Sequence, residues 1–397
     1  MKNRLIVFIA TFLIMVLITP FVFSKLMNSK FDKMLDNLKK SGIEIKEVKN
    51  KSSYILTDRV FLVKVPGKTI DEDSIEYIEA QVESKFKNLP VTDVKFFGDV
   101  KKIVFKDEDL NQINPLIKDK IKFLVITPNF KTYKYKIFDN NISDKSFVFK
   151  FKGINGIYNY PNNENNLNIQ SLILSIENRV KFEANNFKSY YKNNNYQILS
   201  GSEFNFSATY LNNKFLFDSI KSDNKVFISD KAKAISKLLV KNINFNDQLI
   251  LKNNYLDLNL SNIDYKTIQK LRNTNDKKKQ EELLKELVTK GLKANLKFDI
   301  KDIEIKNQKL GFINLYAKLN IKPDDKLFEK LENKDLEDIN LSLKLKTTPK
   351  IATILAITNP VIGAVFMNAK QDKNGVLISL DIKEGKIFLN GKEIKSN

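Results

Sequence analysis

An apolar run at the start of the chain constrains its folding more than any other feature. Nineteen apolar or near-apolar residues make up Leu5–Phe23, and Lys2 and Arg4 precede them. A helix needs about 20 apolar residues to cross the hydrocarbon core of a bilayer, so the run is just long enough. The basic residues before it favour a cytoplasmic N-terminus. We therefore expect residues 1–24 to form a cytoplasmic tip and a transmembrane signal-anchor, with the remainder exported.

A cleaved signal peptide is the alternative interpretation of this run. Such a peptide has an apolar region of about 7–15 residues and small residues before its cleavage site. The run here is longer, and Phe23 stands where a small residue would be needed. The chain also lacks the cysteine that a lipid-modified N-terminus requires. The pattern therefore favours a retained anchor.

Three residue types are missing from the 397-residue chain, namely Cys, His and Trp. Without Cys there is no disulfide, thiolate nucleophile or zinc–thiolate site. Without His the chain lacks the commonest general base and transition-metal ligand, which excludes Ser-His-Asp and Cys-His hydrolases. Carboxylate-pair and Ser-Lys chemistry stay open, but the sequence shows no Gly-rich phosphate loop and no calcium loop of alternating acids. We expect no enzymatic activity, no cofactor and no metal.

The net charge of +20 raises the question of a polyanionic partner. A basic surface can indicate nucleic-acid binding. Here the lysines are scattered singly along the expected strands, as at Lys131, Lys134 and Lys136, and export also argues against nucleic acid. We expect solvated lysine-rich faces, and the alternative is attraction to anionic lipid headgroups or envelope polymers.

Most of the chain after the anchor alternates between apolar and polar residues with period two. Phe147, Phe149 and Phe151, for example, are separated by single residues. This alternation is typical of antiparallel sheets with one packed and one hydrated face. We expect an α+β protein, in which one N-terminal transmembrane helix precedes a large, mainly antiparallel, strand-rich exported region with a few packed helices.

The exported region divides into two parts by pattern. Residues 25–122 read as a helical stem and an N-terminal α+β region, which includes an amphipathic helix over 71–87. That helix is indicated by apolar residues at spacings of three and four, namely Ile75, Ile78, Val82 and Phe86.

Residues 123–397 read as a long antiparallel β-rich region with helices near 231–241, 276–290 and 351–369. Asp230 would cap the first helix, and Gly291 would end the second. The third stretch is apolar and broken at Asn359-Pro360, so it is either a broken helix packed on the sheet or a second membrane span.

The last hundred residues carry a resemblance to a known family. A strand is followed by Lys383-Glu384-Gly385, a short strand and Asn390-Gly391-Lys392, after an earlier pair of strands that follows Gly291. This layout is similar to the C-terminal signature of the YdgA-like family of bacterial envelope proteins (domain of unknown function 945). The resemblance implies a single-pass protein of the inner membrane of a Gram-negative bacterium, with its bulk in the periplasm and no established catalytic residues.

Two functions remain open at this point. The first is a non-enzymatic envelope scaffold or partner-binding protein with a closed core. The second is a lipid-binding or lipid-transfer protein with an apolar β-groove. The expected partners are the inner membrane, through Leu5–Phe23, and anionic lipid or another envelope protein.

Five Asn-x-Ser/Thr sequons occur in the chain, and four of them have an acidic residue two positions before the asparagine. This arrangement resembles the acceptor sequon of bacterial oligosaccharyltransferases. Chance in an Asn-rich, alternating chain is the other explanation. The sequence predicts a glycoprotein modified at one or more of Asn141, Asn205, Asn259 and Asn340. Asn50 has Val48 at the acidic position and is not expected to be modified.

Overall fold

A computed structural model describes residues 25–394, apart from gaps at 54–55, 70–72, 88–92, 109–110, 112–113, 129, 145, 178, 273, 275, 359, 368 and 373–374. The expected transmembrane segment Leu5–Phe23 lies outside the described residues. Within them, no helix combines the length and the apolar character needed to cross a bilayer. The described chain is strand-rich and mostly antiparallel with a few helices, which confirms the expected α+β class.

The chain divides into two compact units, of which unit 1 ends at Asn178 and unit 2 begins at Arg179. The boundary expected from the sequence, between residues 122 and 123, falls within β5 (Lys122–Thr127). This strand pairs with β4 (Val94–Phe105) inside unit 1. Cross-strand hydrogen bonds therefore continue through the expected boundary.

Unit 1 is an antiparallel meander in which each strand pairs with the next one along the chain. It begins with β1 (Glu44–Ser52), β2 (Leu56–Pro66) and β3 (Ile75–Lys87), which lead into β4 and β5. Two later strands are each interrupted once: β6 (Thr132–Ile137) is followed by β7 (Asn140–Ser143), and β8 (Phe147–Lys152) by β9 (Ile154–Asn159). The last strand, β10 (Glu164–Ile176), pairs with both β8 and β9. A short 3₁₀ turn, η1 (Gly67–Thr69), and a one-turn helix, α2 (Asn114–Ile117), lie in the connections.

A helix over residues 25–40 packs on the sheet of unit 1 and supplies the centre of its core. Met27, Phe31 and Leu35 recur every four residues, so they lie on one face of the helix. Phe31 is fully buried, and its ring lies 5.7 Å from that of Phe96 and 5.8 Å from that of Phe61. The helical stem expected from the sequence is confirmed.

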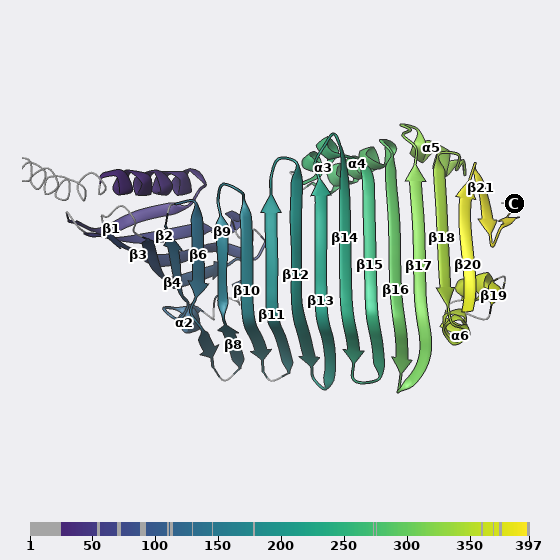
Figure 1. Cartoon of the computed structure of the whole chain (residues 1–397), viewed down its shortest axis with the longest axis horizontal. Coiled ribbons are helices and arrows are strands. Elements are labelled where there is room, and N and C mark those ends of the chain that lie inside the picture. Colours follow the sequence, from purple (N-terminus) through teal and green to yellow (C-terminus); the bar gives the residue numbers. More distant parts are fainter. Residues whose placement is uncertain are drawn as a thin grey trace, which may run out of the picture. The chain divides into compact units, whose positions relative to one another are not determined.

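Unit 2 is a second antiparallel meander with longer strands, which lie side by side in chain order in Figure 1. Its main strands are β11 (Val180–Asn193), β12 (Gln197–Tyr210), β13 (Asn213–Phe227), β14 (Lys231–Phe245), β15 (Leu249–Asp264), β16 (Leu292–Ile305), β17 (Gln308–Ile321), β18 (Ile339–Thr347) and β20 (Gly375–Lys383). Three short strands complete it: β19 (Lys370–Asp372), β21 (Lys386–Leu389) and β22 (Lys392–Ile394). Asn390 and Gly391 both have positive φ, as a two-residue hairpin turn between β21 and β22 requires.

The helices of unit 2 lie at the two ends of its strands (Figure 1). At one end are α3 (Tyr265–Arg272), α4 (Lys277–Thr289) and α5 (Leu327–Glu332), and at the other is α6 (Pro349–Thr358), which is followed by α7 (Pro360–Met367). Asp276 caps α4 by accepting hydrogen bonds from the backbone amides of Lys278 and Lys279. Gly291 follows α4 with a φ of +85°, so the helix expected over 276–290 is confirmed with both of its ends.

The helix expected over 71–87 is wrong, because Ile75–Lys87 form strand β3. The spacing of four between Val82 and Phe86 fits one face of a strand as well as one face of a helix. A register shift in the pairing with β4 at Ile75/Tyr77, where β3 has one extra residue, produces the spacing of three between Ile75 and Ile78 that imitated a helix.

The helix expected near 231–241 is also wrong, because these residues belong to strand β14. Apolar pairs at 234–235 and 238–239 suggested helical periodicity, but their members lie on opposite faces of a strand. Leu238 pairs with Leu256 in an apolar row, whereas Leu239 is 38% exposed on the polar side.

The stretch 351–369 contains two short helices, of which α6 ends at Thr358 and α7 begins at Pro360. Ile351 is 4% exposed and packs with Ile300 and Ile303 of β16. The expectation of a broken helix packed on the sheet is therefore confirmed for this stretch.

Candidate functional site

One face of the unit 2 sheet is apolar across most of its width, and we call it the apolar face. Residues directly opposite each other in neighbouring strands share a face, so the pairing defines rows across the sheet. One row crosses six strands and consists of Leu238, Leu256, Phe298, Leu315, Leu345 and Ile378. The next row consists of Ser236, Leu258, Leu296, Ala317, Leu343 and Leu380. Neither row contains a charged side chain.

The opposite face of the same strands is polar and carries the lysines that the sequence scatters singly. Its cross-strand ion pairs include Lys221 with Glu203 at 3.0 Å and Lys237 with Asp257 at 3.9 Å. These pairs are largely exposed and contribute little to stability. They mark the polar face of the sheet, on which the single lysines of unit 2 lie.

A row of extra residues keeps the apolar face continuous along the length of the strands. Along a strand, residues on the apolar face normally recur every second position. In each of five strands, two consecutive residues of this face are instead three positions apart, because the strand has one extra residue between them. These pairs are Ala184 and Phe187, Phe217 and Ile220, Val240 and Ile243, Leu251 and Asn254, and Ile300 and Ile303. These longer steps lie in register with one another. Asn186, Ser219 and Asn253 within them have positive φ, the backbone signature of a bulge.

The extra residues keep the apolar side chains of each strand on one side of the sheet. A period of two maintained through the whole strand would place Phe217 and Ile220 on opposite sides of the sheet. The extra residue returns both to one side, and bulges of this kind also bend the strand. Asn254 supports the row, because its side-chain amide donates hydrogen bonds to the carbonyls of Val240 and Leu251, both at 3.1 Å.

The part of the apolar face on β11–β14 is divided between aromatic and hydroxyl side chains. On one side of the row of extra residues, Phe206 lies against Phe217 and Phe182, and Phe215 lies against Phe245 at 4.6 Å. On the other side is a strip of short polar residues, which we call the serine strip: Ser189, Ser200, Ser202, Ser222, Asn224 and Ser236. Ser202 and Ser222 share a hydrogen bond of 2.9 Å, and Ser236 donates one to Asn224 at 2.6 Å.

Little of the described chain covers the apolar face. Among the described elements, α6 covers part of this face, because Ile351 packs with Ile300 and Ile303 of β16, and α6 also contacts β17 and β20. The helices α3 and α4 contact β15 and β16. Most side chains of the face are only half-buried, and Phe182, Phe215 and Ile305 are 37–39% exposed. The six strands β14–β18 and β20 alone span about 24 Å at the usual strand spacing. Soluble monomers rarely expose contiguous apolar patches above a few hundred Å², so a surface of this extent marks an interaction site.

Two charged clusters in unit 2 fasten helices to the sheet. Lys290 lies 2.6 Å from Glu286 and 3.0 Å from Asp264, and its hydrogen bonds to them raise its pKa and lower theirs. Lys330 lies 2.7 Å from Asp324 and 2.6 Å from Asp338. Both clusters connect helix ends with adjoining strands and loops, so their arrangement is explained by structure alone. Within the described residues, no group of three or more acidic side chains is placed to hold a metal ion.

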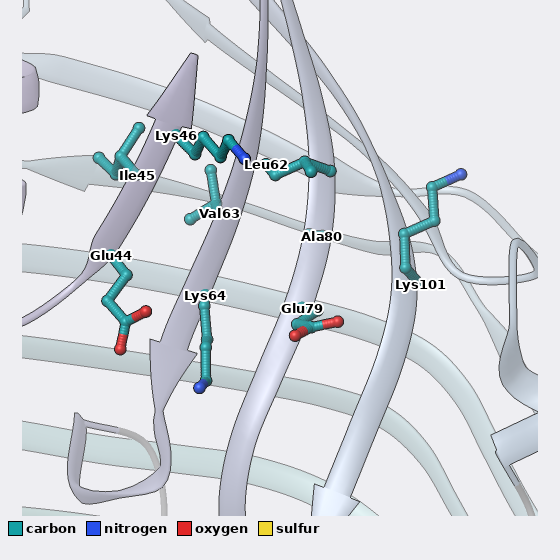
Figure 2. Close-up of a pocket in the computed structure, with 9 residues that line it drawn as sticks. All are labelled: Glu44, Ile45, Lys46, Leu62, Val63, Lys64, Glu79, Ala80 and Lys101. Atoms are coloured by element: carbon teal, nitrogen blue, oxygen red, sulfur yellow. The ribbon is translucent and has the colours of Figure 1, made fainter. Parts of the chain in front are cut away.

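A polar pocket lies on the first four strands of unit 1 (Figure 2). Lys46 of β1, Lys64 of β2 and Lys101 of β4 line it together with two glutamates, Glu44 and Glu79. The Lys64 amine lies over the Tyr77 ring, 4.2 Å from its centre, and Lys101 pairs with Asp119 at 2.5 Å. The mixture of both signs gives no concentrated field for a single anion or cation, so the chemistry of this pocket does not select a ligand.

The four asparagines predicted as glycosylation sites lie far apart in the pairing scheme. Asn141 is exposed on the four-residue strand β7, whose described strand partner is β8. Asn205, Asn259 and Asn340 are half-buried in β12, β15 and β18, which have neighbours on both sides. The side-chain oxygen of Asn205 also accepts a hydrogen bond from the backbone amide of Ser219 at 2.7 Å. The occupancy of all four sites stays a prediction.

No family model, curated protein or solved structure matches this chain. The resemblance to the YdgA-like family therefore stays a prediction that rests on the C-terminal motif and on the layout of the chain. The apolar face itself was not identified from the sequence. Alternation indicated one packed face, but only the pairing shows which residues form a common surface and how little of the described chain covers it.

Proposed function

We propose that this protein binds the hydrocarbon chains of membrane lipids on the apolar face of unit 2, as a membrane-anchored, non-enzymatic protein of the bacterial envelope. One observation carries the proposal: six neighbouring strands present uncharged, largely aliphatic rows that remain only partly covered. Burial of such a surface stabilises a complex by roughly 25 cal/mol per Å² of apolar area removed from water. Of the two functions that the sequence leaves open, this favours lipid binding.

The chemistry of the face selects lipid over a protein partner. Protein interfaces typically combine an apolar centre with hydrogen-bonding groups and with anchors such as Tyr, Trp and Arg. The rows through Leu256 and Leu258 offer aliphatic side chains and almost no hydrogen-bonding groups. Acyl chains need no hydrogen bonds. The serine strip could in turn meet the ester and hydroxyl groups of a lipid whose chains extend over the aliphatic rows.

A photoreactive phospholipid tests this proposal on the full-length chain. The chain is reconstituted into vesicles of phosphatidylethanolamine and phosphatidylglycerol that contain a phospholipid with a diazirine on one acyl chain. After irradiation, labelled peptides are identified by mass spectrometry. We expect label on peptides of β14–β18, on residues of the apolar face.

Adjacent residues on opposite faces of β14 provide matched variants. Leu238→Lys places a charge in the apolar row, whereas Leu239→Lys places it on the polar face of the same strand. We expect the first variant to lose the label and the second to keep it, with both folded by circular dichroism. Equal labelling of the two variants, or a face protected by a second copy or another protein, would contradict the proposal and support a scaffold.

A further inference from the structure

Unit 1 contains an apolar cavity of about 220 Å³ between the helix over residues 25–40 and the sheet. The helix contributes Met34 and Leu38 to its lining, and the sheet contributes Phe96, Phe123, Val125 and Tyr133 among others. Every lining side chain is apolar or aromatic. Tyr133 has the one side-chain hydroxyl in this lining, and it donates a hydrogen bond of 2.9 Å to the carbonyl of Phe130.

The cavity borders the packed core of unit 1, and Phe31, Leu35, Phe61 and Phe96 belong to both. Phe31 fills the core from the centre of the helix and is fully buried. Leu38, one turn beyond the buried Leu35, is 37% exposed at the edge of the cavity, so the space opens to the outside. An apolar cavity of about 150 Å³ can stay dry and bind benzene, so a space of this size and lining is suited to an apolar guest.

The apolar lining of the cavity favours a hydrocarbon ligand over a peptide. A bound peptide would bring backbone N–H and C=O groups that these side chains cannot satisfy, and each such unpaired group is costly to bury. A hydrocarbon chain carries no such groups. Burial raises the pKa of the Tyr133 phenol, so this group stays neutral and adds no charge to the lining.

The position of the cavity in the chain points to the source of that hydrocarbon. The helix that covers it begins directly after the apolar run Leu5–Phe23 of the sequence. From Lys25 to Leu38 the helix rises about 20 Å, which is of the same order as one leaflet of hydrocarbon, about 15 Å. If the run is the expected anchor, the cavity lies beside the membrane, and a phospholipid bound there would draw one acyl chain out of the adjoining leaflet.

We infer that this cavity holds a single acyl chain of a membrane phospholipid, at a site separate from the apolar face of unit 2. The site belongs wholly to unit 1, so it is tested separately from the apolar face of unit 2, although both proposals rest on the expected membrane anchor. The ligand class is an unbranched hydrocarbon chain, whose headgroup remains outside the cavity.

The diazirine phospholipid described above tests the inference at different peptides. In full-length chain reconstituted into the same vesicles, we expect label on peptides of the 25–40 helix and of β5–β6, with Met34, Leu38, Val125 and Tyr133 as the labelled residues. Label on β14–β18 reports the apolar face separately, so failure at one site is distinguishable from failure at the other.

Two pairs of variants make the test specific. Val63→Phe fills the cavity from β2, and Leu62→Phe adds the same ring to the neighbouring residue, which is 45% exposed and absent from the lining. Leu38→Trp obstructs the opening, and Leu26→Trp changes an exposed position on the same helix. We expect Val63→Phe and Leu38→Trp to reduce labelling of the cavity peptides to background, and the two controls to retain it.

The variant Leu38→Trp keeps the inference testable if Val63→Phe does not fold. Leu38 is partly exposed, so Leu38→Trp is tolerated even if the extra ring of Val63→Phe is too large for the core. Absence of label from the cavity peptides of the unmodified chain would overturn the inference. Undiminished label in folded Leu38→Trp protein would overturn it as well.

Discussion

Arg59 Nη1 donates a hydrogen bond of 2.7 Å to Asp32 Oδ1 and so joins β2 to the helix over residues 25–40. The same guanidinium donates two hydrogen bonds to Glu47 of β1, at 2.7 and 3.1 Å, and lies 4.9 Å from the centre of the Phe31 ring. Burial disfavours its charge, but the bonds to Glu47 and Asp32 outweigh this and raise the pKa of Arg59. One buried cation thus connects three elements beside the core of unit 1.

Arg59→Ala should therefore loosen the helix from the sheet of unit 1. Hydrogen bonds to charged groups each contribute about 1.5–3 kcal/mol, and both carboxylates are exposed enough to regain water, so we expect a loss of about 2–3 kcal/mol. Hydrogen exchange of the backbone amides in residues 25–40 should accelerate by the factor that corresponds to this loss of free energy. Lys85→Ala, which removes the exposed pair with Glu83 at 2.6 Å, is the control and should cost under about 1 kcal/mol. Equal losses in the two variants would show that Arg59 has no special role.

The row of extra residues in unit 2 gives a second prediction, at Asn254. Its amide satisfies two backbone carbonyls at the bulge, and the side chain is 7% exposed. Asn254→Ala leaves both carbonyls short of a donor and should lower the free energy of unfolding by about 1–3 kcal/mol, as measured in urea. Asn259→Ala, on the polar face of the same strand, should have little effect. An Asn254→Ala variant as stable as the unmodified protein would show that water replaces the lost donor.

This row also explains what the sequence could and could not predict. The strands on either side of a bulge each alternate with period two, but the phase changes at the extra residue. The pattern over 214–217 is typical of a strand, but its continuation beyond Ser219 within β13 has the opposite phase, because the apolar positions change from odd to even numbers there. A phase change interrupts the alternation, so in a sequence it resembles the end of a strand.

Local capping signals predicted the helix over 276–290 correctly, but they failed at Asp230, which precedes strand β14. The helix capped by Asp276 and ended by Gly291 was predicted at both ends, because capping depends on neighbouring residues alone. The cavity beside Met34 and Phe123 could not be predicted, because its lining comes from residues about ninety positions apart in the chain. No pattern within one element shows which residues meet across such a distance.

Acid should weaken the attachment of α5 to its surroundings. The pKa of Asp324 is lowered to about 2, chiefly by its hydrogen bond to Lys330, from 3.8 for the ordinary side chain. A carboxylate with a lowered pKa in the folded state stabilises the fold above its unfolded pKa, and this contribution is lost as pH falls through the folded value. The loss should therefore occur between about pH 4 and pH 2.

Denaturation in urea at pH 6, 3 and 2 measures this contribution, with Asp324→Asn as the comparison. Other carboxylates also titrate in this range, so the informative quantity is the difference between the two proteins. We expect the unmodified protein to be the more stable at pH 6 and the difference to shrink by pH 2. A difference that stays constant with pH would mean that Asp324 is not held by Lys330 in solution.

Glycosylation, if it occurs, should favour Asn141 over the three other acid-preceded sequons. Transfer requires an asparagine that can leave its strand, and Asn141 is exposed on a four-residue strand. Asn50 is the matched control, because it is also exposed on a strand but has Val48 in place of the acid. Mass spectrometry of the protein from its native host should find glycan at Asn141 and none at Asn50. Modification of Asn259 without Asn141 would show that accessibility in the folded protein does not govern transfer.

A single N-terminal span predicts that both ends of the folded region lie on the periplasmic side. The stretch most able to contradict this is 351–369, but α6 has 10 residues and α7 has 8, and about 20 are needed to cross a bilayer. The buried contact of Ile351 with β16 also holds α6 on the sheet. Reporter fusions after residue 40 and at the C-terminus should both be active with periplasmic enzymes and inactive with cytoplasmic ones. A cytoplasmic C-terminus would require this stretch to leave the sheet and span the membrane, and would refute the single-span topology.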